Sequence, residues 1–291
     1  IKDKLIPGVK KNIKYQIKES KINFLFYKKS GKICYKKIKS KLKNKKHLCY
    51  KIYTSGSTGD KKGVEISKNN FCNYVKNVKS SIQKKFYSKS ILITGDISFD
   101  IVNADIAFAL AYNTSIGITH DQKNIFSIIN FIKEKKIESI YAVPTLWEKI
   151  ILICKNLHLK FNFVKNINSG GEIFKLRQYK SLKKIFPMAN FINFYGPTEF
   201  TINATFCFIN KQNIKYLIDS HNNFSIGKPL NNVKVKIIKN SRKNNWGELA
   251  LSGNQLMLGY SNSDNKNVKK IENQKYYIKK KLCRIRIWNG K

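Results

Sequence analysis

The sequence predicts an α/β protein: a doubly wound, largely parallel sheet flanked by helices, followed by a small antiparallel β subdomain. First, short apolar runs alternate with segments of helical periodicity from about residue 48 to residue 196. Second, a polar, glycine-rich loop directly follows the first of these runs. Third, after about residue 205 short apolar runs follow one another with no strong helix between them. The chain of 291 residues is long enough to bury a sizeable core.

The expected strands of the parallel sheet are short apolar runs bounded by turn residues, as buried strands of βαβ units are. They cover residues 48–55, 91–94, 114–119, 137–143, 164–169 and 189–196. Between them, apolar residues recur at helical spacing. Helices are expected over residues 68–82, 102–111, 125–132, 144–154 and 174–186. Ser67 suits the N-cap of the first helix, and Pro144 suits the first turn of the fourth.

The pattern after residue 205 predicts a separate β unit. Short strands are expected at 233–238, 247–253 and 255–260, with turn residues between them. We therefore divide the chain into an α/β part, residues 1–204, and a small β-barrel-like subdomain, residues 205–278.

The net charge of +40 does not by itself indicate a nucleic-acid surface. Only four of the 57 basic residues are arginine, the residue that base readout and bidentate phosphate contacts favour. We interpret the lysines as a solvated coat, without a specific nucleic-acid partner, and keep polyanion binding as an alternative. No apolar run approaches the roughly 20 residues that span a bilayer, so no membrane partner is expected. The six cysteines form no CxxC pair, which favours free thiols and a cytoplasmic location.

The loop within "IYTSGSTGDKKGVEIS", residues 52–67, has two possible interpretations: a solvated turn or a phosphate cradle. Glycines allow backbone N–H groups to converge on one anion, hydroxyls add donors, and a lysine adds positive charge. The residues that would do this are Thr54, Ser55, Gly56, Ser57, Thr58, Gly59, Lys62 and Gly63. The loop does not fit the Walker pattern, because no Gly-Lys-Ser/Thr triplet occurs.

Residues 53–64 resemble the phosphate-loop signature of the adenylate-forming enzymes, Y-T-S-G-S-T-G-x-P-K-G-V. Ten positions match, and Lys61 stands where the proline is usual. A second stretch, "NFYGPTE" at 193–199, resembles the N-x-Y-G-P-T-E motif of the same family. Further similar stretches follow the family order: "NIKYQIKES" at 12–20, "NSGGEIF" at 168–174, "SIGKPLNN" at 225–232 and "GELALSGNQLMLGY" at 247–260. The resemblance therefore covers nearly the whole chain.

The resemblance implies a nucleotide site for ATP and Mg²⁺. In it Tyr195 offers a flat face to adenine, Asn193 binds the exocyclic amine, Thr198 donates to the α-phosphate and Glu199 is an oxygen ligand of Mg²⁺. Gly171, Glu172 and Gly196 complete the expected nucleotide-binding set, and the catalytic set is Lys62, Thr198 and Glu199.

Phe99-Asp100 resembles the Phe-Asp pair of the amino-acid-activating branch, whose aspartate binds the substrate's α-ammonium. This favours a peptide-synthetase adenylation domain or a D-alanine–carrier-protein ligase over an acyl- or aryl-CoA ligase, which stays an alternative. The substrate pocket implied by the motifs is lined by Asp100, Ile101, Ala104, Tyr141, Asn168, Gly170, Phe194 and Ile202. Tyr141 and Phe194 are expected to narrow it, whereas Ala104 and Gly170 leave room.

The implied activity is formation of an aminoacyl-adenylate from an amino acid and ATP, and transfer of the acyl group to the thiol of a phosphopantetheinyl carrier protein. One signature departs from the family. Where its hinge normally reads T-G-D, this chain aligns Lys279, Lys280 and Lys281. Lysine cannot accept hydrogen bonds from the ribose hydroxyls. We therefore expect residues 279–291 to be a degenerate hinge segment with no C-terminal lid domain after it, and an inactive nucleotide-binding remnant is the second hypothesis.

Overall fold

The computed structural model describes residues 24–29, 32–37, 47–55, 61–82, 87–119, 121–239 and 246–284. Two of the sequence motifs fall outside these ranges, namely residues 12–20 and the Gly56–Gly59 part of the phosphate loop.

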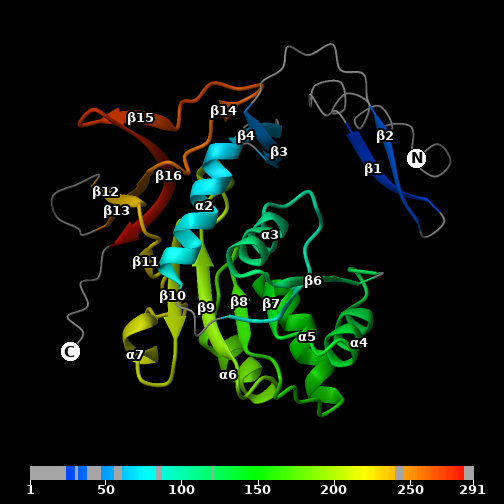
Figure 1. The fold of residues 1–291 in the computed structure, drawn as a ribbon. Helices are drawn as coiled ribbons and strands as arrows, with labels where there is room; N and C mark the ends of the chain where they lie inside the picture. Colours follow the sequence, from blue (N-terminus) through cyan, green and yellow to red (C-terminus); the bar gives the residue numbers. More distant parts are fainter. Residues whose placement is uncertain are drawn as a thin grey trace.

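A seven-stranded sheet is the centre of the fold, as Figure 1 shows. Its order is β11-β10-β9-β8-β7-β5-β6, and the five strands from β9 to β6 are parallel. The strands are β5 (Ser90–Ile93), β6 (Ser115–Ile118), β7 (Ser139–Ala142), β8 (Asn166–Ser169), β9 (Asn190–Tyr195), β10 (Thr205–Ile209) and β11 (Lys228–Pro229). The chain runs outward from β5 to β6 and then returns to β7, so the sheet is doubly wound and the predicted fold class is confirmed.

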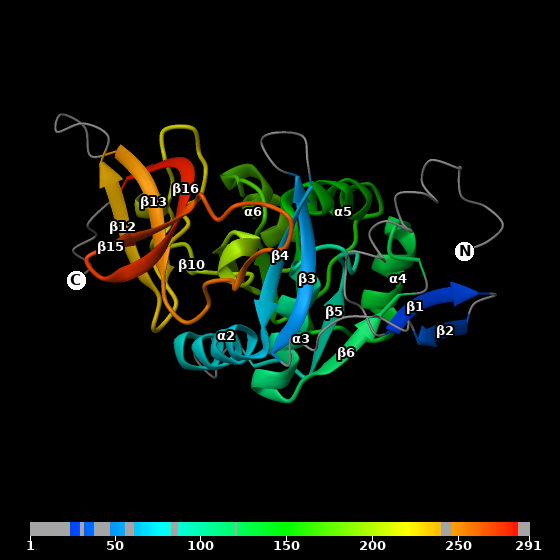
Figure 2. The same cartoon turned by 90° about the horizontal axis from the view of Figure 1, so that it is seen from above.

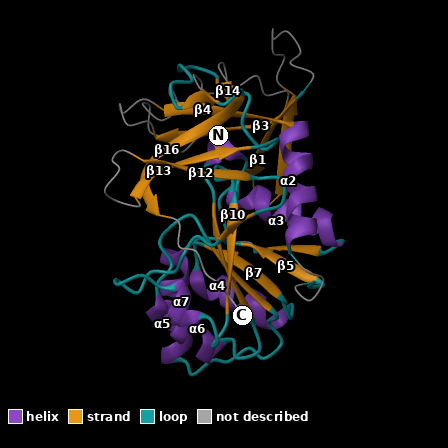
Figure 3. Ribbon diagram, turned by 90° about the vertical axis from the view of Figure 1, so that its left-hand side faces the viewer, coloured by secondary structure: helices purple, strands orange, loops and turns teal. Residues whose placement is uncertain are grey.

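Helices cover both faces of this sheet (Figure 3). The helices are α2 (Lys68–Ser81), α3 (Ile101–Tyr112), α4 (Ile125–Glu134), α5 (Pro144–Asn156), α6 (Leu176–Ile185) and the short α7 (Ile214–Leu217). Two predicted helix starts are confirmed. Ser67 caps α2 in a capping box with Asn70, in which Asn70 N donates to Ser67 Oγ at 3.1 Å, and Pro144 opens α5.

Alternation along the strands of the central sheet gives two large cores, one on each of its faces. Ile140 on β7 belongs to the first core, which α4, α5 and α6 cover. Its neighbour Tyr141 points to the opposite face and belongs to the second core, which α2 and α3 cover. The predicted substrate residues of the sheet therefore lie in the second core, against α3.

Two further sheets and a hairpin complete the described structure. They are formed by β3 (Leu48–Ser55), β4 (Lys61–Ser67) and β14 (Gly259–Tyr260); by β12 (Lys234–Lys239), β13 (Trp246–Ser252), β15 (Val268–Ile271) and β16 (Gln274–Arg284); and by β1 (Phe24–Lys29) and β2 (Lys32–Lys37). The four-stranded antiparallel sheet of β12, β13, β15 and β16 lies at the end of the molecule away from β6 (Figure 2). Leu249 and Leu251 of its strand β13 pack into the second core.

This architecture differs from the sequence expectation in three places. Residues 205–209, expected in the small subdomain, form β10 and pair with β9 in the central sheet. The 255–260 run is a strand only at Gly259–Tyr260, which pairs with β4; just before it, Met257 N donates to the Glu199 carbonyl of η2 and Leu258 N to the Glu65 carbonyl of β4. Of the segment 279–291 expected as a hinge, residues 279–284 continue β16 beside β13 as a regular strand, and residues 285–291 lie outside the described ranges.

No helix among the described residues is long and apolar enough to cross a membrane.

Candidate active site

The predicted polar residues meet where the central strands β5 and β9 end. Asp100 precedes α3, which follows β5, and Thr198 and Glu199 lie in the short 3-10 helix η2 (Thr198–Phe200) after β9. The carboxyl ends of parallel strands, next to the point where the winding reverses, are where ligands of such sheets bind. The Thr198 hydroxyl lies near the Asp100 carboxylate and acts to lower the pKa of Asp100. Burial nevertheless raises the pKa of Asp100 to about 6.

Glu199 is buried and lies against two tyrosines that the sequence analysis had given no role. Tyr260 Oη donates to Glu199 Oε1 at 2.8 Å, and the Tyr277 hydroxyl lies close to the same carboxylate. Burial, together with the charge of Glu199, raises the pKa of both phenols well above the usual value, so they stay protonated donors. The Lys62 ammonium lies 5.4 Å from the centre of the Tyr260 ring, within cation–π range. Tyr260 therefore connects the lysine of the phosphate loop to Glu199.

The stem of the phosphate loop is fixed by a strand pair and by one asparagine. The β3–β4 ladder places Thr54 opposite Lys62, and Ser55 opposite Lys61. Gly63 N donates to Asn262 Oδ1 at 2.9 Å, and Asn262 Nδ2 donates to the Lys61 carbonyl at 2.7 Å. Asn262 thus holds the backbone on both sides of Lys62.

Asn193 presents an acceptor without a partner. Its Nδ2 donates to the Ser225 carbonyl at 2.9 Å, which orients the amide. Its Oδ1 is buried and has no hydrogen-bond partner among the described residues. An amide oxygen of this kind fits the exocyclic amine of adenine, because that amine is a donor. Tyr195, half-buried at the end of β9, lies two residues further along.

The turn after η2 is strained and tightly packed. Thr201 and Ile202 have φ of 51° and 73°, a left-handed conformation that β-branched residues rarely adopt. Gly196 passes this turn so closely that a Cβ built on it would lie 2.6 Å from Asn203 Cα. The fully buried Gln255 holds the turn, with Nε2 donating to the Asn203 carbonyl at 2.9 Å.

The glycine-rich turn after β8 has a role that the sequence did not predict. Glu172 accepts hydrogen bonds from Thr145 N at 2.9 Å and Thr145 Oγ1 at 3.0 Å, and so caps the first turn of α5. Gly171 has φ of +83°, which a residue with a Cβ adopts at a cost. Both residues lie at the same strand ends as Asn193 and Tyr195, but the Glu172 carboxylate is engaged with α5.

The predicted substrate residues gather between α3 and the sheet. Asp100 and Ile101 are partly exposed at the start of α3. The deeper residues are all buried and are Ala104, Tyr141, Asn168, Gly170, Phe194 and Ile202. Asn203 joins them through its side chain. The sequence analysis missed it, although it directly follows Ile202.

The described residues contain no group of three or more His, Cys, Asp or Glu side chains that could hold a metal ion. Mg²⁺ in nucleotide sites is commonly bound by one or two carboxylates together with phosphate oxygens and water. Of the residues gathered here, the buried Glu199 would supply one such carboxylate oxygen.

Comparison with known proteins gives a consistent assignment. Residues 7–261 match the profile of the family described as AMP-binding enzyme. The PKS-NRPS hybrid synthetase acdB of Aspergillus candidus is 32% identical over 225 residues, which are 74% of this chain and 8% of that protein. Among solved structures, the chain is similar to the Vibrio cholerae adenylation domain AlmE, which was solved in complex with glycyl-adenosine-5'-phosphate. The match has a TM-score of 0.69 at 22% sequence identity and covers 81% of this chain and 45% of the AlmE chain. PA1221, an NRPS protein containing adenylation and PCP domains, has a TM-score of 0.68 at 17% identity over 81% of this chain and 48% of its own. The chain thus spans less than half of each of these proteins.

Proposed function

Because the chain belongs to the family of AMP-binding enzymes, we propose that it is an amino-acid-activating, adenylate-forming unit. In this proposal it binds ATP with Mg²⁺ and an amino acid, forms the aminoacyl-adenylate, and passes the acyl group to the thiol of a carrier protein. The adenylation-domain neighbours and the synthetase relative support the reaction class.

The observation that carries the proposal is that Asp100, after β5, lies beside Thr198, after β9. Asp100 is the residue expected to hold the substrate's ammonium, and Thr198 is the one expected to contact the α-phosphate. Their proximity supports an amino-acid site directly beside a phosphate site, as joining a carboxylate to an α-phosphorus requires. If the amino-acid and phosphate sites served unrelated ligands, Asp100 and Thr198 would not need to lie next to each other.

The residues then divide the chemistry between them. Asn193 Oδ1 accepts from the adenine amine, and Lys62 neutralises charge on the outer phosphates. Glu199 would hold Mg²⁺ through one oxygen, and Tyr260 fixes the orientation of its carboxylate. An oxygen of the amino acid's carboxylate attacks the α-phosphorus, and pyrophosphate leaves with the electrons of the broken P–O bond. The carrier thiol next attacks the acyl carbon, loses its proton, and displaces AMP.

ATP–pyrophosphate exchange with a panel of amino acids tests this function. We expect exchange with at least one amino acid, and a loss of roughly 100-fold in Glu199→Gln, because this carboxylate is a metal ligand in the proposal. Glu134→Gln, an exposed site at the end of α4, is the matched control and should exchange like the unmodified chain. Exchange that persists unchanged in Glu199→Gln would contradict the assigned role.

A second candidate function is nucleotide binding without turnover. It is favoured by Lys279, Lys280 and Lys281, which stand where the family's hinge aspartate is usual and lie within β16. Titration with ATP·Mg²⁺ separates the two: binding at micromolar concentration with no exchange for any amino acid supports the remnant. Exchange only with simple carboxylic acids would instead support an acyl- or aryl-CoA ligase.

A further inference from the structure

The predicted amino-acid pocket is filled by aromatic side chains. The Tyr141 and Phe194 rings lie 5.5 Å apart between centroids, and Phe108 of α3 lies 5.7 Å from Phe194. Ala104 is fully buried, and Tyr141 and Phe194 are each 2% exposed. Ala104 belongs to the same buried cluster as the rings of Phe108, Tyr141 and Phe194, so we take its small side chain as packed and not as open space.

A chain of hydrogen bonds fixes the Tyr141 ring in this position. Tyr141 Oη donates to Asn203 Oδ1 at 3.0 Å, and Asn203 Nδ2 donates to Tyr74 Oη of α2 at 2.8 Å. All three side chains are buried, so breaking either bond leaves polar atoms unpaired. The Tyr141 backbone is held as well, since Thr94 Oγ1 donates to its carbonyl at 2.6 Å. The ring cannot swing aside without losing its hydrogen bond to Asn203.

Gly170, expected to leave room, faces the hydroxyl of Tyr141 instead. A Cβ built on Gly170 would collide with Tyr141 Oη and would lie 2.9 Å from the Phe194 carbonyl. The space that a missing side chain would offer is thus already taken by the phenol. This corrects the expectation that Gly170 widens the pocket.

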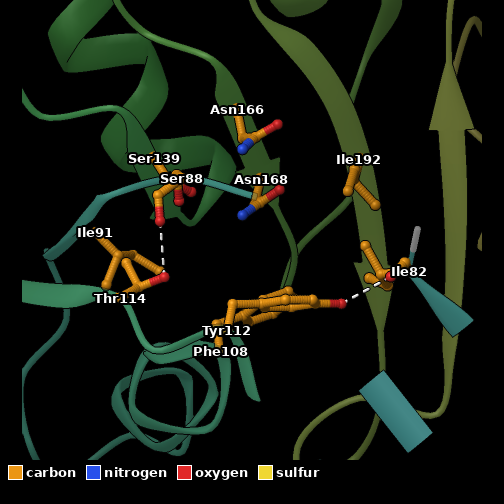
Figure 4. A pocket seen from close by; sticks show the side chains of 10 residues that line it. All are labelled: Ile82, Ser88, Ile91, Phe108, Tyr112, Thr114, Ser139, Asn166, Asn168 and Ile192. Atoms are coloured by element: carbon orange, nitrogen blue, oxygen red, sulfur yellow. Dashed lines mark hydrogen bonds between the residues drawn. The ribbon is translucent and has the colours of Figure 1, made fainter. Parts of the chain in front are cut away.

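The interior beyond the aromatic rings offers no extension. A cavity under α3 is lined by Phe108, Ser139, Asn166 and Asn168, among others, and Figure 4 shows these side chains around it. Its volume is about 10 Å³, which is the space of about one water molecule. Asn168 Oδ1, buried and without a hydrogen-bond partner among the described residues, suits such a water and not the side chain of a substrate.

From these observations we propose that this chain accepts only amino acids whose side chain is no larger than a methyl group. The Tyr74–Asn203–Tyr141 hydrogen-bond chain is the device that enforces the limit, with Tyr141 as the specificity-determining residue and Asn203 and Tyr74 as positioning residues. This inference rests on the proposed function and deepens it, because it names the substrate class of the same site.

Binding of stable aminoacyl-adenylate mimics to the full chain tests it. The probes are the glycyl, alanyl, leucyl and phenylalanyl sulfamoyl-adenosines, measured by calorimetry. We expect the glycyl and alanyl mimics to bind at least roughly 100-fold more tightly than the two large ones, since single methylenes already give 10- to 200-fold discrimination. In Tyr141→Ala and Asn203→Ala this ratio should fall below about tenfold. In the control Tyr112→Phe, which loses a hydroxyl bonded to the Ile82 carbonyl at the far end of α3, the ratio should stay unchanged.

The ratio separates selectivity from stability, because a variant that is merely destabilised loses affinity for small and large mimics alike. Tyr74→Phe provides a second test of the hydrogen-bond chain should Asn203→Ala fail to fold. Equal affinity of the unmodified chain for glycyl and leucyl mimics would overturn the inference and leave the proposed function standing, as would a ratio that Tyr141→Ala does not change. Failure of every mimic and of ATP to bind would overturn the proposed function, and this inference with it.

Discussion

Gln255 links the segment before β14 to the turn of residues 200–203 beside the candidate site. Replacing Gln255 should lower the free energy of unfolding. Its Nε2 donates to the Asn203 carbonyl at 2.9 Å, and its Oε1 accepts from Asn77 Nδ2 at 2.7 Å, with the side chain fully buried. Gln255→Met keeps the length of the side chain but offers neither bond. It leaves a carbonyl and an amide N–H unpaired in a dry interior, at about 1 to 3 kcal/mol each. We therefore expect the free energy of unfolding to fall by about 2 to 6 kcal/mol, a large part of the ~5 to 15 kcal/mol typical of domains.

Urea unfolding of the full chain, followed by tryptophan fluorescence, measures this loss. Gln212→Met is the matched control, because Gln212 is exposed and should change the unfolding free energy by less than about 0.5 kcal/mol. The ATP affinity of Gln255→Met should fall as well, since the turn of residues 200–203 loses its clamp. A midpoint for Gln255→Met equal to that of Gln212→Met would refute the reasoning that the clamp matters for stability.

Three further predictions concern the site itself. Burial raises the pKa of Asp100 to about 6, so its carboxylate forms as the pH rises through that value, and affinity for an amino acid's ammonium should increase up to about pH 7 and then level off. Asp100→Asn should abolish this dependence and raise the KM for the amino acid about 10- to 100-fold, the value of a charge-assisted hydrogen bond. Without ligand, Asp100 should make the protein less stable as the pH rises from 4 to 6, because the folded state holds the proton of its carboxyl more tightly than the unfolded state does. Asn193→Ala should reduce ATP affinity about fivefold, equivalent to about 1 kcal/mol, measured by calorimetry beside the exposed control Asn156→Ala, and equal affinities would argue against Asn193 as the adenine acceptor. Gly196→Ala should lower the thermal midpoint and abolish exchange, since its Cβ would lie 2.6 Å from Asn203 Cα; a variant that keeps full activity would show that the turn can yield.

The parallel part of the fold was predictable because its signals are local. Ser67 and Pro144 mark helix starts through their own backbone chemistry, and each βα unit repeats the same alternation of apolar run and helix. The 255–260 run misled the prediction, since its apolar residues read as a strand. Its backbone instead bonds to two different elements: Met257 N donates to the Glu199 carbonyl and Leu258 N to the Glu65 carbonyl. Such long-range bonds leave no periodicity in the sequence.

The candidate site was predictable by residue type but not by arrangement. The motifs indicated Lys62, Asp100 and Glu199, and the structure brings Asp100 and Glu199 to the same strand ends. The tyrosine that joins Lys62 to Glu199, Tyr260, comes from a distant segment, and no local pattern gives its partner. Asn203 was missed for a different reason: it contacts Tyr141 because the two residues before it adopt a left-handed turn, which β-branched side chains do not suggest.

The bridge that residues 255–262 make between β4, η2 and the loop stem determines how this chain can be divided. Asn262 holds the Lys61 backbone, Tyr260 holds Glu199, and Gln255 holds the Asn203 turn, so three contributions to the site come from beyond β13. A cut between β12 and β13 would therefore give two pieces, neither of which contains a whole site. Co-expression of residues 1–240 with residues 241–291 should restore nucleotide binding only when the pieces reassociate, which makes the chain a natural candidate for a split, complementation-dependent reporter.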